Sequence, residues 1–147
     1  MSITLRVRRV GNRGPPLELP RYETEGSAGM DLRADEAFSL APGERRLVPT
    51  GVAVEIPPGH EGSVRPRSGL AIRHGVGMVN APGTVDSDYR GELQVILVNH
   101  GRDPVSFGRG ERIAQMVIAP VVRATLELVE ALSDTDRGHG GFGSTGK

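Results

Sequence analysis

Short segments that alternate apolar and polar residues, separated by turns, limit the fold of this chain more than any other feature. Residues 3–8 alternate in this way, and residues 52–56 do so again after the breaker Pro49-Thr50-Gly51. A period of two predicts strands with one buried face. We therefore expect half-buried β-strands in both places. Turn signals stand between the segments at Ala41-Pro42-Gly43, Pro57-Pro58-Gly59, Ala81-Pro82-Gly83 and Asn99-His100-Gly101.

Further segments with strand character follow along the chain, at residues 63–67, 92–99, 113–118 and 124–129. The one plausible helix is short and lies near residues 68–73. Short strands at this spacing favour a β-sandwich or β-barrel. A length of 147 residues favours a single domain.

The composition shifts after Ser133. Residues 137–147 contain five glycines and one large apolar residue, Phe142, which has no apolar neighbour to pack against. Such a segment cannot build a core. We expect one β-barrel domain over residues 1–133 and a flexible arm over residues 134–147. Composition alone favours a disordered tail in which Phe142 has no function. The alternative is that Phe142 stacks on a flat ligand such as a nucleobase.

Charge and cysteine content exclude several classes of function. The formal net charge is zero, so we expect no nucleic-acid partner and no membrane partner. The chain has no cysteine, which excludes disulfides, zinc–thiolate sites and a cysteine nucleophile. The amino-terminal residues lack an apolar signal region, and no apolar run approaches the roughly 20 residues of a membrane span. We expect a soluble, cytoplasmic protein.

Two further segments carry polar groups that could bind a ligand or take part in catalysis. In residues 65–71, two arginines and Ser68 precede Gly69, and a guanidinium with a hydroxyl can clamp phosphates. An ordinary solvated strand end is an equally good reading. In residues 80–92, two aspartates, a tyrosine, an arginine and an asparagine fall between strands. An aspartate there can deprotonate a water, but in isolation an Asx-rich turn is the better reading.

Two strands each carry an unexpected polar residue. Asp31 lies between apolar neighbours in AGMDLR, and Gln115 lies opposite apolar residues in GERIAQM. A polar side chain on an apolar strand needs a hydrogen-bond partner. Structural hydrogen bonding explains both residues as well as catalysis does.

Taken together, these segments resemble the five ordered motifs of the trimeric dUTPase family. In chain order they are AGMDLR, RPRSGLA, residues 80–92, GERIAQM and RGHGGFGSTG, and they span residues 28–146. The resemblance implies an all-β, jelly-roll-type barrel that forms a homotrimer. It also implies three active sites at subunit interfaces, with the C-terminal arm of a third subunit closing over each site.

The resemblance also implies roles in hydrolysis of dUTP to dUMP and pyrophosphate. Asp86 would be the general base for in-line attack of water at the α-phosphorus, and Gln115 would help position that water or the α-phosphate. Mg²⁺ would be held mainly by the phosphates and by water, with Asp31 in its outer shell. The implied substrate-binding residues are Arg67, Ser68, Gly69, Met78, Asn80, Gly83, Thr84, Val85, Tyr89, Arg137, Phe142, Gly143, Ser144 and Thr145.

Within that set, Asn80 and the hairpin backbone would pair with the uracil edge, and Tyr89 would pack on the deoxyribose. Arg67 and Ser68 would hold the α and β phosphates. The arm would supply Arg137, Ser144 and Thr145 for the γ phosphate, with Phe142 stacked on uracil. Such an enzyme would limit uracil in DNA and supply dUMP for thymidylate synthesis. The alternatives are a dCTP deaminase-type enzyme of the same fold, a non-catalytic dUTP-binding regulator and a purely structural β-trimer.

Overall fold

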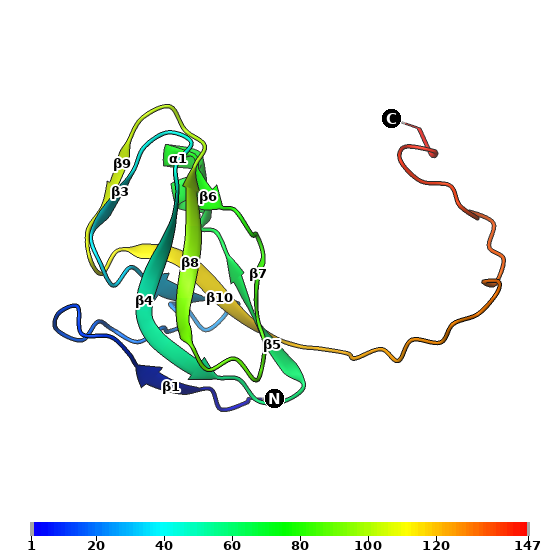
Figure 1. Cartoon of the computed structure of the whole chain (residues 1–147), viewed down its shortest axis with the longest axis horizontal. Coiled ribbons are helices and arrows are strands. Elements are labelled where there is room, and N and C mark those ends of the chain that lie inside the picture. The colour runs from blue at the N-terminus through cyan, green and yellow to red at the C-terminus, as the bar shows by residue number, and fades with distance from the viewer. Residues whose placement is uncertain (1, 147) are drawn as a thin grey trace.

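Two antiparallel four-stranded sheets share one core in the computed structural model, which describes residues 2–146 (Figure 1). One sheet has the order β1-β4-β8-β6, the other has the order β2-β10-β5-β7, and β3 pairs with β9 in a small third sheet. This is the all-β, jelly-roll-type architecture that the sequence predicts. The strands are β1 (Arg6–Arg9), β2 (Met30–Arg33), β3 (Phe38–Leu40), β4 (Arg45–Glu55), β5 (His60–Arg65), β6 (Val76–Met78), β7 (Gly83–Val85), β8 (Glu92–Asn99), β9 (Val105–Phe107) and β10 (Arg112–Pro120).

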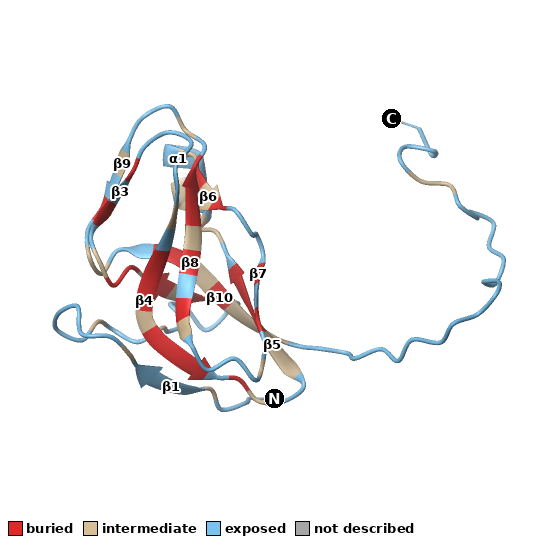
Figure 2. Ribbon diagram, viewed as in Figure 1, coloured by how far each residue is buried: buried red, intermediate tan, exposed pale blue. Residues whose placement is uncertain are grey.

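The core lies between the two larger sheets (Figure 2). Val48 and Val95 come from the first sheet, Leu32 and Met116 come from the second, and all four side chains are fully buried. β2 and β3 bury alternate residues, as a period of two predicts, whereas β4, β8 and β10 also bury consecutive residues. Burying a side chain of this size contributes about 1.5–3 kcal/mol.

One predicted break is wrong. Pro49-Thr50-Gly51 does not end a strand, because β4 runs through it from Arg45 to Glu55. The pairing of β4 with β8 shifts register there, Gly51 adopts a left-handed φ of 75°, and the Thr50 hydroxyl donates to the Leu93 carbonyl oxygen at 2.6 Å. A bulge absorbs the irregular residues and bends the strand without ending it.

The two ends of the β-rich region also differ from expectation. β1 is an edge strand paired only with β4, and all four of its residues are exposed. From the predicted segment 3–8, Leu5 is half-buried and packs against the core. Residues 124–129, which were predicted to be a strand, have no strand neighbour and are exposed in an extended tail (Figure 1). A strand needs a partner for its backbone groups, and this chain alone offers residues 124–129 none.

A buried ionic cluster ties the amino-terminal segment to the barrel. The Asp35 carboxylate, almost fully buried, accepts hydrogen bonds from Arg13 Nη1 at 2.9 Å and from Arg109 Nη2 at 2.7 Å. Arg13 Nη2 also donates to Glu92 at 2.8 Å. These bonds, to Glu92 first and then to Asp35, raise the pKa of Arg13. The cluster joins the loop at Arg13, the loop before β10 and the start of β8.

The predicted short helix is confirmed as α1 (Ser68–His74), which ends at Gly75 in a left-handed conformation. It follows β5 directly, so it fixes the position of the segment that contains Arg67 and Ser68. Across residues 2–146, no helix is long and apolar enough to cross a membrane.

Candidate active site

Four of the five sequence motifs lie on a single sheet. Asp31 is on β2, Gln115 is on β10, Arg67 follows β5, and the segment 80–92 contains β7. These strands are neighbours in the order β2-β10-β5-β7. Segments that are far apart in the sequence thus become adjacent through strand pairing.

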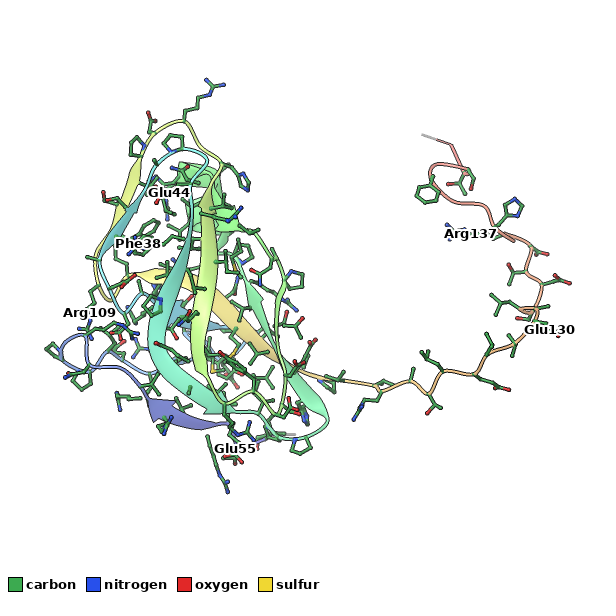
Figure 3. The ribbon with its side chains drawn as sticks, viewed as in Figure 1. Phe38, Glu44, Glu55, Arg109, Glu130 and Arg137 are labelled. Atoms are coloured by element: carbon green, nitrogen blue, oxygen red, sulfur yellow. The ribbon has the colours of Figure 1, made fainter. Side chains whose placement is uncertain are left out.

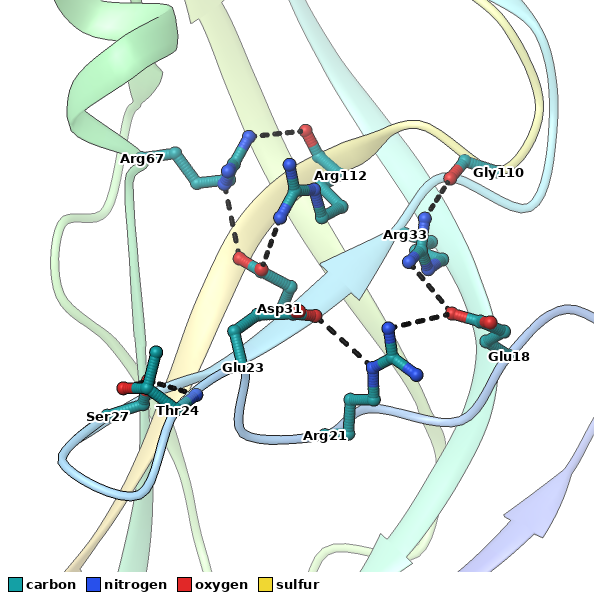
Figure 4. A network of polar contacts seen from close by, with 10 residues as sticks. All are labelled: Glu18, Arg21, Glu23, Thr24, Ser27, Asp31, Arg33, Arg67, Gly110 and Arg112. Carbon is teal, nitrogen blue, oxygen red and sulfur yellow. Dashed lines mark hydrogen bonds and ion pairs between the residues drawn. The ribbon is translucent and has the colours of Figure 1, made fainter.

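Asp31 lies at the centre of a charged cluster on the outer face of this sheet (Figure 4). Its Oδ1 accepts a hydrogen bond from Arg67 Nε at 3.1 Å, and its Oδ2 accepts one from Arg112 Nη1 at 3.2 Å. Arg67 Nη1 also approaches the Arg112 carbonyl oxygen at 3.5 Å. One carboxylate therefore holds two guanidinium groups, and both point toward it in Figure 4.

A bulge in β10 puts Arg112 on this face. Gln115 pairs with Asp31 and Ala114 pairs with Leu32, but Arg112 pairs with Arg33, so the extra residue Ile113 interrupts the register. Ile113 is buried beside Ala114, and strict alternation would then have turned Arg112 inward. Bulges often redirect a side chain next to an active site.

Gln115 is fixed by two neighbouring segments. Its Nε2 donates to the Pro66 carbonyl oxygen at 3.0 Å. On the other side, a Cβ on Gly29 would lie 2.7 Å from Gln115 Oε1, so any larger residue there would have to displace this amide. Gly29 stands directly before β2 in the motif that contains Asp31. The structure thus brings Asp31, Arg67 and Gln115 together, as the sequence motifs suggested.

The phosphate-binding segment predicted at residues 67–69 lies at the start of α1. Ser68 is exposed, whereas Arg67 and Gly69 are half-buried. Arg67, Leu70 and His74 line one wall of an open pocket of about 560 Å³, and Arg33, Arg109 and Arg112 are among the residues lining the rest. Several arginines at one concavity suit an anionic ligand.

The predicted residues of the segment 78–92 fall into two sets by burial. Met78, Gly83 and Val85 face the interior, whereas Asn80, Thr84, Asp86 and Tyr89 are exposed. The Tyr89 hydroxyl donates to the Glu92 carbonyl oxygen at 3.0 Å, and the Tyr89 N–H donates to the Asp86 carbonyl oxygen at 3.1 Å. Ala81 and Pro82 are joined by a cis peptide bond. Thr84 and Asp86 of the exposed set line one shallow pocket together with His60 and Arg123.

Asp86 and Gln115 do not meet within one chain. On β5, Gln115 pairs with Arg65 and Val85 pairs with Gly62. Asp86, the residue after Val85, therefore lies level with Glu61, which is four residues along β5 from Arg65. Four residues along a strand span about 13 Å, and two strand spacings add about 10 Å across the sheet. The predicted base and the predicted positioning residue therefore lie at different ends of the sheet.

The C-terminal arm also lies apart from the sheet (Figures 1 and 3). Phe142 is fully exposed with a φ of 50°, and Gly143 has a φ of 87°. Arg137 Nε donates to the Gly140 carbonyl oxygen at 2.8 Å, and the Ser144 N–H donates to the Gly141 carbonyl oxygen at 3.0 Å. Ser144 and Thr145 are exposed. The arm is a series of local turns in extended chain.

The sequence did not indicate that Arg112 contacts Asp31. Strict alternation back from Gln115 assigns Arg112 to the inner face, and the bulge at Ile113 interrupts that alternation. The cost of burying an arginine without a partner is the one signal in the sequence that argues against an inward Arg112.

Comparison with known proteins agrees with this arrangement. The dUTPase family profile matches residues 16–146. A deoxyuridine 5'-triphosphate nucleotidohydrolase of Anaeromyxobacter sp. (strain Fw109-5) is 76% identical over 147 residues, which is 100% of both chains. A protein of the same name from Methylocella silvestris is 55% identical and covers 98% of this chain and 92% of its own length.

Solved structures with the same fold include phage enzymes. The dUTPase of Staphylococcus bacteriophage 80alpha, solved with dUPNHPP, superposes with a TM-score of 0.89 at 28% identity, covering 98% of this chain and 99% of its own. A mutant dUTPase from phage phi11 of S. aureus, described with a structural Mg(II) ion, has a TM-score of 0.78 at 25% identity, covering 87% of this chain and 97% of its own. The profile match, the full-length relatives and the shared fold agree, and the chain belongs to the dUTPase family.

Proposed function

We propose that this chain hydrolyses dUTP to dUMP and pyrophosphate. The observation that carries the proposal is the full-length 76% identity to a deoxyuridine 5'-triphosphate nucleotidohydrolase. All five motifs are present, and four of them lie on one sheet around Asp31, Arg67 and Gln115. The proposed substrate carries three negatively charged phosphates, so an arginine-lined pocket beside these residues suits it.

Water is the proposed nucleophile, with attack in line at the α-phosphorus. Asp86 is an exposed carboxylate in the segment 78–92, where it can accept a proton from a water beside the substrate. The Gln115 amide donates to the Pro66 carbonyl oxygen and occupies the space that Gly29 leaves open. In this position it orients the water or the α-phosphate. Arg67 and Ser68 bind the α and β phosphates, and pyrophosphate leaves with the electron pair of the broken bond. Positioning and charge stabilisation supply the catalysis.

Uracil selection is assigned to the hairpin. Asn80 and the neighbouring backbone offer a hydrogen-bonding edge, and a Cβ on Gly83 would lie 3.3 Å from Asn80 Nδ2, so Gly83 is close to this amide. Cytosine would present the opposite donor and acceptor pattern and leave buried polar groups unpaired, which costs far more than a lost apolar contact. A thymine methyl would clash with Gly83 to Val85, and Tyr89 would leave no room for a 2′-hydroxyl.

Mg²⁺ is the proposed cofactor, because the phosphate chain needs neutralising charge and Mg²⁺ prefers oxygen ligands. Asp31 fits an outer-shell role, since its carboxylate is partly open to solvent while two arginines hold it. When bound, the ion would lower the negative charge on the phosphates.

A homotrimer with shared sites is the proposed assembly. The register that separates Asp86 from Gln115 within one chain leaves a complete site to be formed by different subunits. The tail supports this assembly, because Val122, Leu126, Leu128 and Leu132 are all highly exposed in the single chain. Large apolar side chains exposed in this number within one short segment suit burial against another subunit. The arm of residues 134–147, whose start at residue 134 stays a prediction, would then close over a neighbouring site as a lid.

Mixing two inactive variants tests the shared site. Asp86→Asn and Gln115→Ala chains, unfolded together and refolded, would form mixed trimers in which some sites have both wild-type residues. We expect each variant alone to be inactive and the mixture to regain part of the wild-type rate. A mixture as inactive as its components, with mixed trimers verified by mass spectrometry, would place both residues in the site of one chain.

The substrate is tested by pyrophosphate release from dUTP, dCTP, dTTP and UTP with Mg²⁺ present. Release from dUTP alone supports both the reaction and the role of the hairpin. Ammonia release from dCTP would instead support a deaminase, and tight dUTP binding without turnover would support a regulator. We also propose a cytoplasmic location, where a dUTP-hydrolysing enzyme meets the nucleotide pool.

A further inference from the structure

We propose that Gly91 and Arg13 set the sugar selectivity of this chain, because together they fix the Tyr89 ring where it excludes a 2′-hydroxyl. The inference rests on the proposed function, in which Tyr89 packs on the deoxyribose, and it adds the residues that hold the ring. A ring excludes a hydroxyl by steric overlap with it. The penalty against a ribonucleotide can therefore be no larger than the free energy of moving the ring aside.

The barrel core does not hold the Tyr89 ring, because the residue is 45% exposed. An exposed aromatic side chain can adopt several rotamers, and holding it in one of them costs entropy. Packing in the interior thus cannot explain a fixed ring at this position. The contacts that fix it must come from the segment 78–92 and from whatever touches that segment.

The backbone of Tyr89 is held at both of its polar groups. Its N–H donates to the Asp86 carbonyl oxygen at 3.1 Å, and its carbonyl oxygen accepts from Arg90 Nη1 at 3.0 Å. The same Arg90 nitrogen donates to the Ser87 carbonyl oxygen at 2.7 Å. The turn therefore presents the Cα–Cβ bond of Tyr89 in one direction, and only the side-chain torsions remain to be set.

Gly91 and Glu92 set these torsions. The Tyr89 hydroxyl donates to the Glu92 carbonyl oxygen at 3.0 Å, which fixes the far end of the ring. A Cβ on Gly91 would overlap the Tyr89 hydroxyl and would lie 2.7 Å from Cζ and 3.1 Å from Cε2. The ring occupies the space that Gly91 leaves open, so any larger residue there would have to displace it.

Arg13 fixes the residue that accepts this hydrogen bond. Its two terminal nitrogens donate to the two carboxylate oxygens of Glu92, at 3.0 Å and 2.8 Å. A guanidinium that meets both oxygens holds a carboxylate in one geometry. The Glu92 side chain is only 13% exposed, and Arg13 also donates to the buried Asp35, so water screens this pair less than a surface pair. The amino-terminal loop thus reaches the sugar end of the site through Glu92 and Tyr89.

The test compares kcat/KM for dUTP and for UTP in the wild type, Gly91→Ala and Glu92→Gln, using the full-length chain. Gly91→Ala displaces the ring, whereas Glu92→Gln removes the carboxylate that Arg13 holds and keeps the backbone carbonyl. Gly26→Ala is the matched control for the first variant, because a Cβ there meets nothing within 4 Å. Glu55→Gln, which loses an exposed ion pair, is the control for the second. Thermal unfolding verifies that each variant is folded.

We expect Gly91→Ala to raise kcat/KM for UTP about tenfold or more, because the displaced ring no longer meets the 2′-hydroxyl. The value for dUTP should fall by less than about fivefold, since only the packing of the ring on the sugar is lost. Glu92→Gln should raise the UTP value about two- to fivefold, less than Gly91→Ala because the carbonyl still accepts its hydrogen bond. General damage lowers the rate with both nucleotides, so a purely structural role cannot produce a gain with UTP. The two controls should match the wild type.

A second measurement reports on the ring without any substrate. The chain has two tyrosines and no tryptophan, so in a Tyr22→Phe background the tyrosine band of the near-ultraviolet circular dichroism comes from Tyr89 alone. A ring in a fixed environment gives a signal that is lost when the ring moves freely. Gly91→Ala should lose most of this band, and Gly26→Ala should keep it.

A kcat/KM for UTP that does not rise in a folded Gly91→Ala chain, or an unchanged tyrosine band, would overturn the assignment of Gly91. Glu92→Gln keeps the test open if Gly91→Ala fails to fold, because a UTP value that does not rise in that variant contradicts the same account. The role of Arg13 is read from a double-mutant cycle on the ratio of the two kcat/KM values. Arg13→Gln should have a smaller effect in the Glu92→Gln background, and additive effects would show that Arg13 does not act through Glu92. The proposed function fails separately, through a wild-type chain that releases pyrophosphate from neither nucleotide.

Discussion

Gly29 and Gln115 are so close that a single methyl group on Gly29 would lie 2.7 Å from the amide oxygen of Gln115. The glycine of the first motif therefore leaves the space that the amide of the fourth motif occupies. The close approach of Gly29 and Gln115 joins two segments that are far apart in the sequence.

Gly29→Ala should reduce turnover more than stability. The added methyl displaces the Gln115 amide, and a small misplacement of a positioning group can lower the rate by about a hundredfold. Steady-state kinetics with dUTP measure the effect, and thermal unfolding measures stability. Gly26→Ala is the matched control, because a Cβ at Gly26 meets nothing within 4 Å. Equal turnover in the two variants would show that the position of Gln115 does not limit the reaction.

Asp86→Asn should abolish most turnover while leaving binding nearly intact. The amide keeps the size of the carboxylate but cannot accept the proton, and a general base contributes about 10²- to 10⁴-fold. Single-turnover hydrolysis of dUTP and the affinity for dUpNHpp are the two measurements. Asp88→Asn, a neighbour in the same turn, is the control and should behave like the wild type. Near-normal turnover in Asp86→Asn would remove Asp86 as the base.

Truncation after Asp136 should disable catalysis and spare the barrel. Residues 137–146 make local turns and lie apart from the sheets, so the thermal midpoint should stay within a few degrees of that of the full chain. The rate with dUTP should fall by at least about a hundredfold, because the lid and its phosphate contacts are missing. Thermal unfolding measures the stability of the barrel, and steady-state kinetics measure the loss of rate. Full activity without the arm would refute the lid.

Asp35→Asn should lower the free energy of unfolding by about 3 kcal/mol. The buried carboxylate is the common partner of Arg13 and Arg109, and removing one side of a buried pair leaves charge without compensation. Both arginines keep some solvent contact, so the loss of stability should lie at the low end of the range for breaking a buried ion pair. Urea unfolding measures it. Glu36→Gln, which breaks the more exposed pair with Arg46, should cost less than about 1 kcal/mol.

Local sequence patterns predicted most strands but not their irregularities. The segment 92–99 coincides with β8, and the short helix coincides with α1, because alternation and turn residues act locally. The passage of β4 through Pro49 was not predictable, since the pairing with β8 tolerates a bulge there. Residues 124–129 have the alternating pattern of a strand but do not form one. The sequence encodes the propensity, whereas a neighbouring strand must provide the backbone hydrogen bonds.

Sequence motifs named candidate residues for the site but did not give their geometry. The motifs named Asp31, Arg67 and Gln115, and strand order places them on or beside neighbouring strands. Asp86 was assigned to the same reaction, yet the register of one chain holds it apart, and no sequence pattern encodes that distance. Arg112 lies on the same face as Asp31 because of the bulge at Ile113, which depends on three-dimensional packing.

Hydrolysis of dUTP in ¹⁸O-labelled water tests the central claim most directly. Water attack at the α-phosphorus places the label on dUMP and leaves pyrophosphate unlabelled, which ³¹P NMR or mass spectrometry resolves. Label on dUMP after a single turnover is the result that this account predicts. Label in pyrophosphate would mean attack at the β-phosphorus, and the absence of both products would contradict the proposed function itself.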